Sequence, residues 1–81
     1  MKITVDCYAG YRGDETPRRI WFGSRPVDIT DVMDRWLAPD HRYFKCADAD
    51  GAVYIIRQDM ETLDWALTFY RQAGEIDSSN G

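Results

Sequence analysis

The stretch RYFKCADADGAVYIIRQ, residues 42–58, decides the fold of this 81-residue chain. Two runs rich in aromatic and β-branched residues flank Asp50-Gly51, a dipeptide typical of tight hairpin turns. A two-residue turn at this dipeptide would place Phe44 opposite Arg57. Both faces of the hairpin carry apolar side chains, so we expect its two strands to be central in an antiparallel sheet.

A second hairpin is predicted over residues 18–28. Gly23-Ser24 fits the two central positions of a type II′ turn, because glycine tolerates the positive φ that the first position requires. The resulting register sets Arg19 opposite Asp28 and predicts an ion pair between them. The side facing the core would comprise Ile20, Phe22 and Val27.

Alternation of apolar and polar residues predicts two further strands. Residues 2–9 alternate with period two, which indicates a half-buried strand. Residues 10–17, GYRGDETP, are rich in glycine and acids and predict a loop. A last strand over 64–70 would place Trp65, Leu67 and Phe69 on one inward face.

Residues 31–37 admit two interpretations. Thr30 could cap a short helical turn over this segment. Alternatively, the strand that starts after Ser24 continues through a bulge near Asp31, with Val32 and Trp36 pointing inward. We favour the bent strand.

The pattern predicts a mainly β fold. Six short strands favour a small antiparallel, strongly bent six-stranded sheet or a half-open barrel of SH3-like or OB-like size, because closure hides strand edges. We expect one domain over residues 1–70 and a flexible tail over 71–81. A chain of 81 residues has little material for a deep cleft, and it must use its three Trp, five Tyr and three Phe largely in the core.

Charge and cysteine content restrict the function classes. The formal net charge of -4 disfavours electrostatic capture of nucleic acid or of anionic lipid. The absence of a long apolar run and the position of Asp6 predict a cytoplasmic protein without a membrane segment, in which Cys7 and Cys46 are reduced. We expect a monomer or a weak dimer with no cofactor.

Four segments resemble a known group of proteins. These segments are DRW at 34–36, DHRYFK at 40–45, DG at 50–51 and VYIIR at 53–57. Together they resemble small uncharacterised bacterial cytoplasmic proteins that share the pattern LDRW…DHRYFKV…DG..Y.LR.D…W.L. The resemblance covers roughly residues 3–70 and departs at Met33 and Cys46, where the pattern has Leu and Val. It implies a small, mostly β cytoplasmic domain and brings no activity.

The chain has few candidates for catalysis or metal binding. His41 is the only histidine, and the two cysteines are not arranged as CxxC. A zinc site of Cys7, Cys46 and His41 would have to join two inward thiols to an exposed turn, so we expect His41 to bond the neighbouring backbone instead. Residues 48–51, DADG, begin like a calcium loop but place the glycine at position four rather than six. We therefore predict neither a catalytic nor a metal site.

The segment RRIWFGSR, residues 18–25, is the strongest binding candidate. It contains three arginines and no acid within a net acidic chain. In one interpretation Arg19 forms an ion pair with Asp28. Trp21 then belongs to the hydrophobic interior and packs against Trp36. In the other, Trp21 is an exposed anchor surrounded by arginines. The candidate binding residues are Trp21, Arg18, Arg19, Arg25, Tyr8 and Tyr11.

These observations lead to one functional hypothesis and two alternatives. We expect a non-enzymatic protein-interaction module with an unidentified protein partner, because aromatic residues are abundant and no catalytic motif is present. The first alternative is a barrel that binds single-stranded nucleic acid through its arginine and tryptophan face. The second alternative, a small enzyme, has less support.

Overall fold

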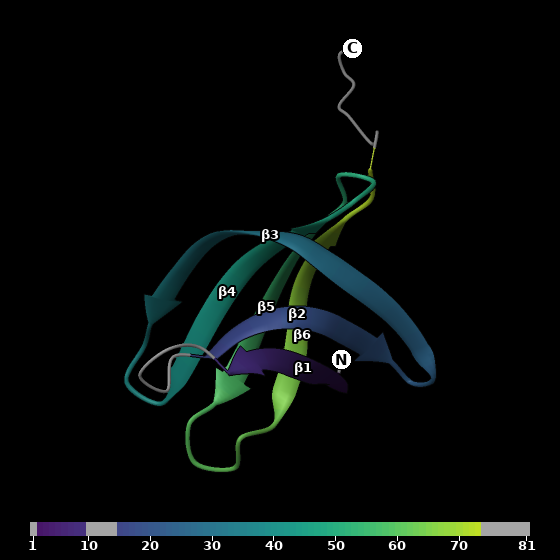
Figure 1. The fold of residues 1–81 in the computed structure, drawn as a ribbon. Helices are drawn as coiled ribbons and strands as arrows, with labels where there is room; N and C mark the ends of the chain where they lie inside the picture. Colours follow the sequence, from purple (N-terminus) through teal and green to yellow (C-terminus); the bar gives the residue numbers. More distant parts are fainter. Residues whose placement is uncertain (1, 10–14, 74–81) are drawn as a thin grey trace.

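The computed structural model describes residues 2–9 and 15–73, and this part of the chain folds into six β-strands (Figure 1). The strands are β1 Lys2–Ala9, β2 Glu15–Phe22, β3 Arg25–Leu37, β4 His41–Asp48, β5 Val53–Asp59 and β6 Trp65–Arg71. All neighbouring strands pair antiparallel, and the order β1-β2-β3-β4-β5-β6 closes into a barrel. The predicted mainly β fold is therefore confirmed.

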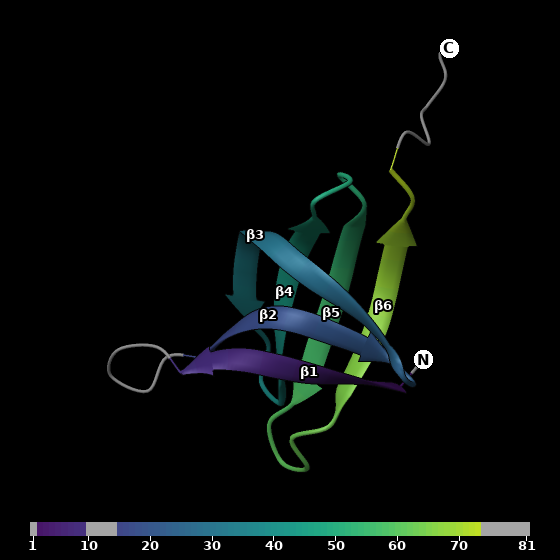
Figure 2. The same ribbon diagram turned by 45° about the vertical axis from the view of Figure 1, so that its right-hand side comes forward.

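The long strand β3 joins the two halves of the barrel. Its first part, Arg25–Asp28, pairs with β2, and its second part, Ile29–Leu37, pairs with β4. Figures 1 and 2 show β1, β2 and the first half of β3 running across the front of β4, β5 and β6. A sheet that wraps in this way hides its inner face without a helix.

The bend in β3 depends on two register irregularities, one between Ile29 and Asp31 and one between Val32 and Asp34. The bent strand is confirmed, and the alternative helical turn is wrong. Val32 packs against the core as predicted, but Trp36 is 41% exposed, so its predicted inward position is wrong. The second irregularity reverses the alternation of side chains, which turns Trp36 to the outer face.

On the outer face, Trp36 stacks on Tyr43 of β4. Their ring centroids lie 5.3 Å apart and the ring planes differ by 3°. The two residues are direct cross-strand partners, which explains the close stacking. Trp36 therefore packs against Tyr43 rather than in the predicted layer with Trp21.

The β4–β5 hairpin forms, but its predicted register is wrong by one residue. Its turn has three residues instead of two: Asp48 N–H donates to the carbonyl of Ala52, and Gly51 N–H donates to the carbonyl of Asp48. Gly51 has a φ of 91°, the conformation expected after a type I turn. As a result Phe44 lies opposite Ile56, not opposite Arg57. This shift gathers one inner apolar face: Phe44, Cys46, Tyr54 and Ile56.

The β2–β3 hairpin has the predicted register. Gly23 has a φ of 66°, Phe22 pairs with Arg25, and Arg19 pairs with Asp28. β2 starts earlier than predicted, because Glu15–Pro17 belong to the strand and pair with β1. The predicted loop is therefore wrong for these three residues, and its part at 10–14 lies outside the described residues.

The last strand departs from strict alternation. Trp65 and Leu67 face the core, whereas Phe69 is 46% exposed, so its predicted inward position is wrong. A register shift in the pairing with β5 inserts one residue and reverses the alternation before Phe69. β6 ends at Arg71 and Ala73 still packs against the core, so the fold extends slightly past residue 70. The predicted tail beyond 73 lies outside the described residues.

Aromatic and aliphatic side chains from five strands fill the barrel. Phe44 and Trp65 pack with ring centroids 5.8 Å apart, and Ile20 and Ile56 are fully buried. Burial also raises the pKa of the Cys46 thiol to about 12, which leaves it protonated at neutral pH. The core comprises Ile3, Ile20, Phe44, Cys46, Ala52, Tyr54, Ile56 and Trp65. The described part of the chain contains no helix that could cross a membrane.

Candidate functional site

The barrel closes incompletely between β6 and β1. Within the described residues these strands pair only at Lys2 with Ala66 and at Ile3 with Trp65. β6 continues along β5 to its end, so residues 68–71 have a strand on one side only among the described residues. Figure 2 shows the upper end of β6 rising past β1. The backbone groups on that outer edge are available to another strand.

The beginning of β3 forms the other border of this gap. Arg25–Asp28 pair with β2 alone, because pairing with β4 starts at Ile29. Pro26 lies in this segment and has no backbone N–H to donate. The β3 edge is therefore a poor template for a further strand, and the β6 edge is the better one.

A groove lies between the two borders, and we call it the seam groove. Its narrow part has a volume of about 310 Å³, and its wider continuation toward the β4–β5 turn has a volume of about 550 Å³. The narrow part is lined by Phe22, Arg25, Val27, Tyr54, Leu67 and Tyr70. The ring centroids of Phe22 and Tyr54 lie 6.1 Å apart, and those of Tyr54 and Tyr70 lie 5.1 Å apart. Three packed rings therefore form a continuous aromatic wall.

Tyr54 connects the groove to the β4–β5 turn. Its hydroxyl donates a 2.8 Å hydrogen bond to Asp48, and the same carboxylate accepts the N–H groups of Asp50 and Ala52 at 2.9 and 3.0 Å. Burial alone would raise the pKa of Asp48, but these hydrogen bonds outweigh it and hold the pKa below its usual value. Burial and the adjacent carboxylate raise the pKa of Tyr54. The pair is thus an ionised carboxylate and a neutral phenol at neutral pH.

The predicted residues Arg19 and Trp21 lie outside the groove, on the outer face of β2. Arg19 Nε lies 2.7 Å from Asp28 Oδ1, which forms the predicted ion pair, and this carboxylate raises the pKa of Arg19. Trp21 Nε1 donates a 2.9 Å hydrogen bond to Asp6, and the Arg19 guanidinium lies 5.9 Å from the Trp21 ring. Trp21 is half-buried, so it is neither a core residue nor a fully exposed anchor.

The two other predicted arginines, Arg18 and Arg25, line different cavities. Arg18 is exposed at the register irregularity between β1 and β2, and it lines one cavity beside Val5, together with Arg19, and another beside Ile29. Arg25 is the member of the predicted set that lines the seam groove. Tyr8 belongs to β1, and Tyr11 lies outside the described residues.

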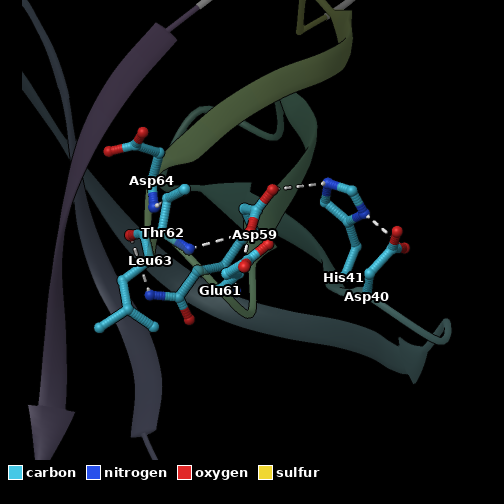
Figure 3. Close-up of polar contacts among 8 residues, drawn as sticks. Asp40, His41, Asp59, Glu61, Thr62, Leu63 and Asp64 are labelled. Carbon is cyan, nitrogen blue, oxygen red and sulfur yellow. Dashed lines mark hydrogen bonds and ion pairs between the residues drawn. The ribbon is translucent and has the colours of Figure 1, made fainter.

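His41 lies at the end of the barrel opposite the β4–β5 turn, and its side-chain contacts differ from the predicted ones (Figure 3). It opens β4, and its ring lies between two carboxylates rather than against the neighbouring backbone. Nδ1 is 3.0 Å from Asp40 Oδ1, and Nε2 is 3.6 Å from Asp59 Oδ2. Backbone N–H groups of Thr62 and Glu61, which bond the same carboxylate, lower the pKa of Asp59. These contacts brace the β5–β6 loop.

The candidate zinc ligands do not form a centre. Cys46 is buried inside the barrel, whereas His41 is tied to the loop at its end. Among residues 2–9 and 15–73, no group of three or more His, Cys, Asp or Glu side chains could hold a metal ion. The calcium-like sequence at 48–51 is explained by the turn that Asp48 stabilises.

Comparison with known proteins identifies no relative. No family model matches the chain, and no curated protein or solved structure is significantly similar to it. The resemblance to the LDRW…DHRYFKV group therefore remains a prediction.

Sequence reasoning missed the aromatic members of the seam groove, above all Tyr54 and Tyr70. The three-residue turn places Tyr54 on the inner face with Phe44 and Cys46, and Tyr70 follows the register shift in β6, so a two-residue turn and strict alternation do not lead to either position. The sequence contains one related signal: Pro26 has no N–H to donate to a neighbouring strand, which marks the beginning of β3 as an edge. That signal predicts an open edge but does not locate the aromatic wall.

Proposed function

We propose that this chain is a non-enzymatic protein-interaction module of the cytoplasm, which binds an extended peptide segment along the outer edge of β6. The observation that carries the proposal is the coincidence of a strand edge at residues 68–71, which no other strand of the described chain covers, with the aromatic seam groove beside it. A peptide that adds to a sheet edge gains backbone hydrogen bonds, and its alternate side chains enter the adjoining groove. The two features supply both requirements.

The polar groups around the groove support binding rather than catalysis. The hydroxyl of Tyr54 donates a hydrogen bond to the carboxylate of Asp48, and two backbone N–H groups of the turn donate to the same carboxylate. A general acid or base must present a free proton or lone pair to its substrate. These groups instead rigidify the end of the groove, as a docking site requires.

Binding of single-stranded nucleic acid is the weaker alternative. The arginine and tryptophan face that motivates it contains Asp6 and Asp28, which engage Trp21 and Arg19 directly. Carboxylates in these positions would repel a phosphate backbone, and the net charge of -4 acts in the same direction. Titration with an oligonucleotide at low salt tests this alternative.

The proposal is tested by selecting ligands from a display library of random decapeptides. We expect selected peptides to protect the amides of residues 68–71 from hydrogen exchange, because these amides gain partners. An N-methylated version of the best peptide, with alternate backbone N–H groups blocked, should lose binding. Equal binding of the methylated peptide, or a library without binders, would refute β6-edge addition.

A matched pair of variants locates the site. Tyr70 lines the groove and is 49% exposed, whereas Met60, in the β5–β6 loop at the far end of the barrel, is 45% exposed. Tyr70→Ala should weaken peptide binding at least tenfold because it removes one ring of the aromatic wall. Met60→Ala removes a similarly exposed apolar side chain and should leave the affinity unchanged.

A further inference from the structure

The wider part of the seam groove has an uneven charge distribution. Its lining includes three acidic residues, Asp28, Asp48 and Asp50, and one basic residue, Arg25. Arg19 already neutralises Asp28 from the outer face of β2. The remaining carboxylates lie on the β4–β5 turn, at the same end of the barrel as the upper end of β6 (Figure 2).

The two carboxylates of the turn remain charged in different ways. Hydrogen bonds keep Asp48 ionised, although its oxygens are already occupied by Tyr54 and the backbone. Asp50 is exposed, and its side chain makes no ion pair with any other residue in the described part of the chain. Asp50 can therefore contact a ligand directly, while Asp48 contributes its field.

The aromatic wall adjoins these carboxylates. Tyr54 belongs to both parts of the groove, and Tyr70 packs on it with 49% of its surface exposed. An aromatic ring beside acidic groups is a favourable environment for a cation, because the ring face and the carboxylates both attract positive charge. A planar guanidinium can stack on such a ring and pair with a carboxylate at once.

We infer that the peptide bound in the seam groove carries a basic residue, arginine or lysine, which lies over Tyr70 and faces the carboxylates of Asp48 and Asp50. This inference depends on the proposed function, because β6 must hold the backbone of that peptide. The narrow part of the groove, lined by Phe22, Val27 and Leu67, takes an apolar side chain of the same segment. The partner chemistry is thus an extended segment that combines an apolar with a basic residue.

The positive charge of Arg25 allows the preference of the groove for a basic residue to be tested. Arg25 lines both parts of the groove, and its positive charge offsets a small part of the rise in the pKa of Tyr54 that burial and Asp48 cause. A basic ligand must overcome this charge, so Arg25→Gln should tighten binding of a basic peptide. An acidic ligand would respond in the opposite direction.

The experiment starts from the tightest peptide in the decapeptide selection. Its affinity is compared by fluorescence polarisation with that of a peptide in which every arginine and lysine is replaced by glutamine. We expect a loss of about tenfold on this replacement and weaker binding at higher salt. A best binder without basic residues, or one unaffected by the replacement, overturns the inference but leaves edge binding intact. A library without binders overturns both.

Charge-neutral variants of the protein identify the carboxylate. Asp50→Asn should weaken the basic peptide about two- to fivefold, because the contact is exposed. Glu61→Gln removes one negative charge from the loop at the opposite end of the barrel and should have no effect. Equal effects of both variants would reduce the preference to net charge and overturn the assigned contact. Dimerisation that Tyr70→Ala abolishes would instead assign the groove to a second copy of the chain.

Discussion

The β4–β5 pair and the β1–β6 pair are both antiparallel, yet they differ in extent. β4 and β5 pair over seven positions, whereas β1 and β6 pair over two within the described residues. The first pair carries the inner core residues Phe44, Cys46 and Ile56. The second leaves the last residues of β6 beside a groove. The β4–β5 pair is thus a closed wall that supplies stability, and the short β1–β6 pair leaves an open seam where a partner could bind.

If the proposed function is correct, this difference is how a small domain reserves a binding surface. In a chain of 81 residues most large side chains are needed inside. The seam groove uses rings at the border of the core, such as Tyr54, which is 5% exposed, and Tyr70, which is 49% exposed. The same aromatic stack therefore packs against the core on one side and lines the proposed binding groove on the other.

The largest expected effect is on the closed wall. Ile56→Ala leaves a cavity at a fully buried position and should lower the free energy of unfolding by about 2 to 5 kcal/mol. Tyr70→Ala at the seam should cost less, because half of this side chain is already in water. Urea denaturation of both variants measures the difference. Equal losses would mean that the seam is part of the core and would remove the contrast.

The next effect concerns the turn that connects wall and groove. Asp48→Ala removes the acceptor for Tyr54, Asp50 and Ala52 and should cost about 1 to 3 kcal/mol. Thermal or urea unfolding of the variant at pH 7 checks this value. A neutral effect would show that the turn residues Ala49–Gly51 hold the hairpin without the carboxylate.

The pH dependence of this effect has a definite sign. The pKa of Asp48 is lower in the folded chain than in the unfolded chain, so its charge stabilises the fold above the unfolded pKa of about 4. This contribution is lost as the pH falls through the lowered folded value. The stability difference between wild type and Asp48→Asn should therefore shrink between pH 6 and pH 2. A constant difference over that range contradicts the assignment.

Local patterns in the sequence predict the β2–β3 hairpin better than the β4–β5 hairpin. The β2–β3 register followed from Gly23-Ser24, because a two-residue turn fixes every pair after it. The β4–β5 register failed because Asp50-Gly51 also fits a three-residue turn with Gly51 in the left-handed region. The two-residue and the three-residue turn favour similar residues, and packing of the inner face of the hairpin decides which of them forms.

Two of the predicted side-chain orientations are wrong because an irregular residue precedes them in the strand. Trp36 and Phe69 come after register shifts, and each points outward although simple alternation places it inward. A bulge is favoured by the curvature of the closed barrel, which a local sequence pattern does not contain. The seam depends on the same curvature, so the binding hypothesis that was drawn from residues 18–25 selected a different surface.

A smaller effect distinguishes the Trp21 surface from the seam groove. Trp21→Phe keeps an aromatic ring at this position but removes the hydrogen bond to Asp6. The loss of this bond should lower the free energy of unfolding by about 0.5 to 1 kcal/mol. Peptide affinity should stay unchanged, because Trp21 lies outside the groove. A calorimetric titration that loses binding in this variant would transfer the site to the outer face of β2.

The smallest effect is expected for the ion pair between Arg19 and Asp28. The two side chains are 38% and 70% exposed, so their 2.7 Å contact is well solvated and should contribute about 0.2 to 1 kcal/mol. A double-mutant cycle with Arg19→Gln and Asp28→Asn isolates this coupling, which should decrease further at 1 M salt because ions screen exposed charges. A coupling well above this range would mean that the ion pair on the outer face of β2 contributes substantially to the stability of the fold. A small coupling leaves register, rather than charge, as the reason why this hairpin forms, since Ile20 and Phe22 pack inward whichever residues stand at positions 19 and 28.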